Sequence, residues 1–109
     1  DFQLLEAGGH LTLSALTGGP IQAGDMFSSD PAVKDNGLVA LKDDKQLFAA
    51  AQVLPIIRES KASDTVKKSL NEISKKLTTN DLIAMNRKVN DGSDIGDVAD
   101  EWISSKNIA

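Results

Sequence analysis

The feature that most constrains this chain is a change in the spacing of its apolar residues after Ser60. Beyond that point they recur at intervals of four, three and four, at Val66, Leu70, Ile73 and Leu77. This spacing places one residue per turn on the same face of an α-helix. Lysines occupy the positions between them and suit the solvent side. The pattern predicts an amphipathic helix from Ser63 onward.

Two more helices are predicted in the rest of the chain. Thr78 and Asp81 have the spacing of a capping box at a helix start, and Asp91-Gly92-Ser93 ends that helix. Asp94 is suited to cap a third helix. The residues expected to form the core share these apolar faces: Leu70, Ile73, Leu82, Val98 and Trp102.

The chain before Ser60 favours strands. Residues 2–7 and 21–27 read as strands on either side of a short helix, His10 to Leu16, which Thr17-Gly18-Gly19-Pro20 would end. This β-α-β order is typical of parallel sheets.

Two more strands are expected, and they complete the predicted order of elements. They cover residues 38–44, after a turn at Asp35-Asn36-Gly37, and 52–60, where Pro55 implies a sheet edge or bulge. The expected fold class is therefore α/β, with a β-α-β start, further strands and a C-terminal group of three helices.

Composition excludes several classes of function. A chain of 109 residues suits one small domain. Its net charge of −4 argues against sequence-independent nucleic-acid binding, which depends on neutralising phosphates. Cysteine is absent, which excludes disulfides and thiolate chemistry. No stretch approaches the roughly 20 apolar residues of a membrane helix.

No motif indicates catalysis. The chain has neither a phosphate-binding G-x-x-x-x-G-K-[ST] loop nor a G-x-S-x-G elbow. Its single histidine, His10, follows two glycines and is interpreted as a turn or cap residue. Four aspartates spaced by three from Asp91 to Asp100 suit capping and an exposed helix face better than a calcium loop. We expect no enzyme activity, no metal site and no cofactor.

The most unusual polar segment is Phe27-Ser28-Ser29-Asp30, directly before Pro31. Ligands of open α/β sheets lie beyond the carboxyl ends of strands, so this segment could face a ligand. The alternative is an ordinary strand-to-turn exit at the surface.

Longer stretches resemble a known family. They are "LFAAAQVLPIIRES", the tail "LTTNDLIAMNRKVNDGSDIGDVADEWISSKNIA" and the upstream "GDMFSSDPAV" region. In this order they resemble the C-terminal part of ABC-transporter substrate-binding proteins for glycine betaine, carnitine, choline and related osmoprotectants. The resemblance covers essentially the whole chain.

The resemblance implies part of a type II periplasmic-binding-protein fold, in which two lobes enclose the ligand. Residues 1–30 would be the end of the second lobe's β-α-β and a hinge strand, and residues 31–109 the closing part of the first lobe. Because the opening strands of the first lobe would be absent, the chain could form a homodimer or be completed by a complementing chain.

The resemblance also implies a ligand site. A quaternary ammonium ion is held by aromatic faces, which Phe27 and Phe48 could supply. Ser28 and Ser29 would donate hydrogen bonds to a ligand carboxylate, and Asp30 would act as a countercharge. Gln52 would lie nearby, across the hinge. The family often has tyrosines at this site and this chain has none, so these residues form a partial cage.

The implied function is non-enzymatic: an extracytoplasmic solute-binding protein of an ABC importer, periplasmic or a cell-surface lipoprotein. Its partners would be a small zwitterion or quaternary amine and the permease subunits, with no nucleic acid. The alternative is a stand-alone interaction or structural domain that uses its amphipathic helices.

Overall fold

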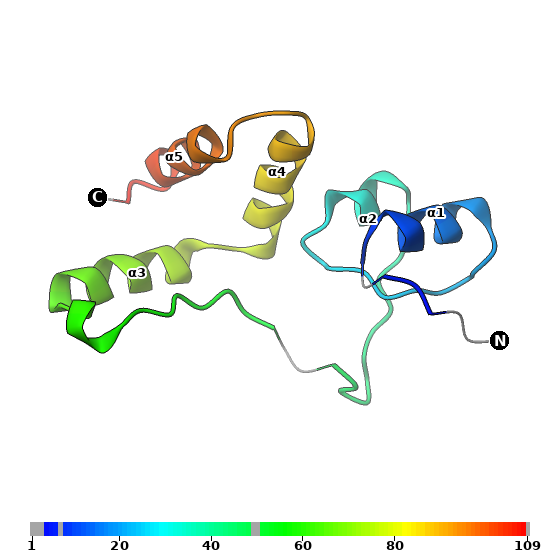
Figure 1. Cartoon of the computed structure of the whole chain (residues 1–109), viewed down its shortest axis with the longest axis horizontal. Helices are drawn as coiled ribbons and strands as arrows, with labels where there is room; N and C mark the ends of the chain where they lie inside the picture. The colour runs from blue at the N-terminus through cyan, green and yellow to red at the C-terminus, as the bar shows by residue number, and fades with distance from the viewer. Residues whose placement is uncertain (1–3, 7, 49–50, 109) are drawn as a thin grey trace. The chain divides into compact units, whose positions relative to one another are not determined.

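A computed structural model of the chain describes residues 4–6, 8–48 and 51–108. Regular structure in these residues is helical (Figure 1). The elements are α1 (His10–Gly18), α2 (Pro31–Asp35), the 3-10 helix η1 (Glu59–Lys61), α3 (Asp64–Lys76), α4 (Thr79–Asn90) and α5 (Ile95–Ser105).

The expected α/β fold class is wrong for the described residues, because none of them belongs to a strand. Residues 21–27 and 38–44 contain no strand, and residues 52–60 run without regular structure into η1. Of the strand expected at 2–7, residues 4–6 are described and contain no strand, and the others lie outside the described residues. The predicted sheet of a type II periplasmic-binding-protein fold is thus not formed by the part of the chain described here.

The reason is that β propensity describes how side chains fit a pleated surface, and a strand also needs a neighbour for its N–H and C=O groups. No strand among the described residues lies beside residues 51–58, and the apolar side chains of this segment are exposed. Ile56, for example, is 94% exposed. Pro55 removes one more backbone donor from this segment.

The chain divides into two compact units, residues 1–41 and 42–109, which are described separately. The boundary expected at residue 30 is a different one, because it separates parts of the family's two lobes. That boundary stays a prediction.

In the first unit, the predicted helix at His10 is confirmed as α1. Its N-terminus is closed by Glu6, whose carboxylate accepts a hydrogen bond from the Leu11 amide at 2.6 Å. The Thr12 hydroxyl, in a side chain only 3% exposed, donates to the Glu6 carbonyl at 2.6 Å. The helix ends at Gly18, and the φ of 89° at its C-cap, Gly19, is accessible to glycine at little cost.

The short helix α2 was not predicted. Asp30 caps it by accepting a hydrogen bond from the Ala32 amide at 2.8 Å. Pro31 is buried at the first helical position, where its missing N–H costs nothing. Asn36 and Gly37 form the turn that ends α2, as the sequence indicated.

In the second unit, the three predicted C-terminal helices are confirmed as α3, α4 and α5. Their caps are side chains of Ser63, Thr78 and Asp94, each accepting backbone hydrogen bonds in the first turn. At Thr78 the full capping box with Asp81 is present.

The apolar centre of this unit lies where α4 packs against α5. Val98 is 5% exposed, which confirms its predicted place in the core. The other four predicted core residues are only half-buried: Leu70, Ile73, Leu82 and Trp102.

Replacing Val98 with alanine should lower the free energy of unfolding by about 1–3 kcal/mol, because it removes two buried methyl groups and leaves a cavity. Ile95→Ala on the same helix is the matched control, since Ile95 is 70% exposed and should change stability by less than about 0.5 kcal/mol. Urea unfolding followed by circular dichroism measures both. Equal effects of the two substitutions would contradict the assignment of Val98 to the core.

Candidate functional site

The segment Phe27 to Asp30 forms a tight turn in the first unit. The Asp30 amide donates a hydrogen bond to the Phe27 carbonyl at 3.0 Å, with Ser28 and Ser29 at the corner. Asp30 then caps α2. The local sequence is therefore explained by a turn followed by a capped helix that begins at Pro31.

The same turn exposes groups that can bind a ligand. The Phe27 side chain is 63% exposed, although it is apolar and aromatic, and Ser28 is exposed beside it. One carboxylate oxygen of Asp30 is used by the Ala32 amide. The turn thus presents a ring and hydroxyl groups within four consecutive residues.

Phe48 and Gln52 belong to the second unit, and both are exposed. Phe48 lies in a loop that Asp43 organises, because the Asp43 carboxylate accepts hydrogen bonds from the amides of Leu47 and Phe48, each at 2.9 Å. The Phe48 and Leu47 amides lower the pKa of Asp43 below its ordinary value. The structure brings Phe27, Ser28, Ser29 and Asp30 together, whereas a shared site with Phe48 and Gln52 stays a prediction.

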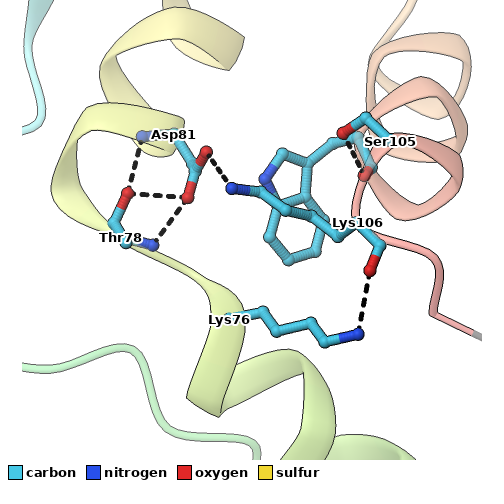
Figure 2. Close-up of polar contacts among 6 residues, drawn as sticks. Lys76, Thr78, Asp81, Ser105 and Lys106 are labelled. Carbon is cyan, nitrogen blue, oxygen red and sulfur yellow. Dashed lines mark hydrogen bonds and ion pairs between the residues drawn. The ribbon is translucent and has the colours of Figure 1, made fainter.

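A second polar cluster links α4 to the end of α5, and Figure 2 shows the Asp81 carboxylate between Thr78 and Lys106. One carboxylate oxygen accepts hydrogen bonds from the Thr78 hydroxyl at 2.6 Å and the Thr78 amide at 3.0 Å. The other oxygen lies 2.9 Å from Nζ of Lys106. A capping box and an ion pair thus share one carboxylate.

Lys76, at the end of α3, joins this cluster from the other side. Its Nζ donates to the carbonyl of Lys106 at 2.8 Å (Figure 2). It also donates to the carbonyl of Asn107 at 3.3 Å. It also lies 3.0 Å from the Glu72 carboxylate. The ammonium group therefore ties α3 to the chain just past the end of α5, where carbonyls lack helical partners.

A small pocket of about 110 Å³ lies between α4 and α5. It is lined by Asp81, Ala84, Met85, Lys88, Val98, Glu101, Trp102 and Ser105. Each carboxylate in it already has a lysine partner, Lys106 for Asp81 and Lys88 for Glu101 at 2.6 Å. The charges of the pocket are thus balanced internally, which favours a packing role over a ligand site.

Trp102 lines this pocket, and its indole nitrogen is buried without a hydrogen-bond partner in the described part of the chain. Lys106 Nζ lies 6.0 Å from the centre of its ring, at the limit of a cation–π contact. The Thr78 hydroxyl and then Lys106 hold the pKa of Asp81 well below its ordinary value of 3.8. The indole N–H has a smaller influence in the same direction, because it does not reach hydrogen-bond geometry.

Neither a metal site nor a membrane span is found where the structure is described. Within residues 4–6, 8–48 and 51–108, no three acidic or histidine side chains converge as metal ligands. Of the aspartates from Asp91 to Asp100, Asp94 caps α5 through the amides of Gly96 and Asp97. Over the same residues, no helix has both the length and the apolar character needed to cross a bilayer.

Comparison with models of known families shows the family to which this chain belongs. Residues 2–105 match the model for the substrate-binding domain of the ABC-type glycine betaine transport system. The chain belongs to this family. Glycine betaine substrate-binding domains are non-enzymatic components of ABC transport, and they act with a small-molecule ligand and permease subunits. No solved structure matches the chain.

The capping box of this binding domain is visible in the sequence, whereas the contacts of Lys76 and Lys106 are not. The Thr78–Asp81 spacing is a local signal. The Lys76 contact joins residues 30 positions apart, and nothing in the spacing of lysines along the chain indicates which one reaches a helix end.

Asp81→Asn should destabilise the chain at neutral pH and make its stability depend less on pH in the acid range. Because the pKa of Asp81 is lowered on folding, its ionised form stabilises the folded state fully above about pH 5. This contribution is lost as the pH falls through 3.8 toward the lower folded-state value. The gap in melting temperature between wild type and variant should therefore shrink in acid.

Asp100→Asn is the control, since Asp100 is an exposed aspartate on α5. It should follow the wild type to within about 0.5 kcal/mol. Wild-type and Asp81→Asn curves that stay parallel between about pH 7 and pH 3 would show that the negative charge of Asp81 does not stabilise the fold.

Proposed function

We propose that the chain contributes to an extracytoplasmic solute-binding protein of an ABC importer, whose ligand is a small zwitterion or quaternary amine such as glycine betaine, choline or carnitine. The observation that carries the proposal is the exposed Phe27 ring beside hydroxyl groups in one turn. Membership of the glycine betaine family supports it.

The ring supplies the recognition of the cation. A trimethylammonium group is attracted to the negative face of an aromatic ring by about 0.5–2 kcal/mol. An exposed phenylalanine costs solubility unless something covers it, and a methylated cation covers it without needing a hydrogen bond. Phe27 is suited to this role because it carries no polar atom of its own.

The hydroxyl groups supply the recognition of the anionic end. Ser28 and Ser29 follow the ring directly, so a ligand whose cation rests on Phe27 extends its carboxylate toward them. Hydrogen bonds to a charged acceptor contribute about 1.5–3 kcal/mol each. Asp30 adds negative charge for the cation, through a carboxylate that also caps α2.

Phe48 and Gln52 complete the proposed ligand set on the strength of the family resemblance. Both side chains are exposed, so each is accessible to a ligand. In this proposal Phe48 gives a second ring face and Gln52 a hydrogen-bonding amide. The protein would be free in the periplasm or anchored as a cell-surface lipoprotein.

A stand-alone interaction domain is the second candidate, and one observation favours it. Apolar side chains are exposed along the irregular segments between the helices, at Val39, Leu41, Val53, Leu54 and Ile56. Such side chains suit a protein partner. The family match does not support a homodimer or a complementing chain, so neither is part of the first proposal.

Phe27→Ala should weaken choline binding by roughly fivefold, which corresponds to about 1 kcal/mol of lost cation–π attraction. Leu11→Ala is the matched control, because Leu11 lies in the same unit and is 62% exposed against 63% for Phe27. Isothermal titration with choline, and with its uncharged analogue 3,3-dimethylbutan-1-ol, separates the attraction of the cation from simple apolar contact.

Two results would argue for the interaction domain instead. One is the absence of heat with choline, glycine betaine and carnitine at millimolar concentration. The other is an equal affinity for choline and its uncharged analogue, which would mean that no ring recognises the charge.

A further inference from the structure

We infer that Gly8 is a positioning residue for the ligand site, because it provides the surface on which the Phe27 ring is seated. The inference rests on the proposed function of Phe27 and extends it to a residue outside the turn. It follows from the close approach of the two residues within the first unit.

Gly8 has no room for a side chain. A Cβ atom built on it would lie 2.8 Å from Cδ2 and 3.1 Å from Cε2 of the Phe27 ring, and 3.4 Å from the Phe27 backbone nitrogen. The first distance is shorter than carbon atoms tolerate without displacement. The ring therefore lies directly against the glycine backbone, and its position there depends on the absence of a Cβ.

The backbone of Gly8 is itself held in place. Its φ of 67° is the left-handed conformation, which favours glycine. The next residue, Gly9, is the N-cap of α1, and its carbonyl accepts a hydrogen bond from the Leu13 amide at 3.1 Å. A Cβ at Gly9 would overlap the Glu6 carboxylate that closes the same helix. Gly8 thus joins the ring to a fixed helix end.

Binding is favoured if the Phe27 ring is already held in position before the ligand arrives. A ligand that must immobilise a freely rotating side chain loses affinity through the entropy of that side chain. Phe27 is 63% exposed, so the contact with Gly8 holds the ring and still leaves much of it accessible to a cation. Displacing the ring from Gly8 should therefore weaken choline binding by up to about fivefold, which is the loss expected when the ring is removed altogether, without any contact between Gly8 and choline.

The test compares Gly8→Ala with Gly37→Ala. Gly37 lies in the same unit and has nearly the same φ, 65°, but a Cβ there would meet nothing within 4 Å. Both substitutions impose left-handed strain on alanine, and only the first meets the ring. By titration with choline we expect up to about fivefold weaker binding for Gly8→Ala and less than about twofold for Gly37→Ala.

The double variant Gly8→Ala/Phe27→Ala shows whether Gly8 acts through the ring. It should bind choline no more weakly than Phe27→Ala alone, because residues in contact are not additive. Additive losses, or equal effects of Gly8→Ala and Gly37→Ala, would overturn the inference. If Phe27→Ala itself leaves choline binding unchanged, it is the proposed function that fails.

A measurement without ligand keeps the inference testable if Gly8→Ala does not fold. The Hα resonances of Gly8 in the wild-type NMR spectrum should carry a ring-current shift that disappears in Phe27→Ala. Unchanged Gly8 resonances in Phe27→Ala would show that the ring is not seated there, and the inference would be wrong.

Discussion

The carboxylate of Asp81 is the group on which the C-terminal unit most depends. It closes the first turn of α4 through Thr78 and holds the end of α5 through Lys106. The chain beside Lys106 in turn supplies the carbonyls that receive Lys76 from α3. Three helices of a unit with little fully buried apolar surface are thereby connected through one side chain and its partners.

This arrangement fits the modest core of the unit. Val98 is nearly fully buried, whereas Trp102 and Leu82 keep part of their surface in solvent. Burial of apolar area is the usual source of stability, and here less of it is available per residue. Hydrogen bonds to charged groups contribute more than neutral ones, which makes the polar cluster correspondingly important.

The features predicted correctly are local, whereas most of those missed depend on distant partners; the short helix α2, with its local Asp30 cap, is the exception. Helix α1, the three C-terminal helices and the Thr78 and Asp94 caps follow from spacing within a few residues, and all are present. The predicted strands are not formed in the described residues. Segments such as 52–57 have apolar, β-branched side chains, but no neighbouring strand is available among the described residues to pair with them. The family resemblance was confirmed, since it rests on the order of residues along the whole chain.

The candidate ligand site shows the same limit. The unusual composition of Phe27 to Asp30 predicted a ligand site at the end of a strand; the strand end is wrong, because the segment is a turn that leads into α2, and the ligand site stays a proposal. The sequence offered no sign that Gly8, 19 positions earlier, lies under the Phe27 ring. A glycine in a pair is readily explained as part of a turn, and its contact appears only in three dimensions.

The placement of charges has a consequence for a protein family that serves cells under osmotic stress. Added salt shortens the range of electrostatic attraction from about 8 Å at physiological ionic strength to about 3 Å at 1 M. The Lys42–Asp44 pair, with side chains 88% and 70% exposed, is open to such screening. The Asp81 side chain is only 17% exposed and is also held by Thr78, so its ion pair with Lys106 should be weakened less by added salt than the exposed pairs.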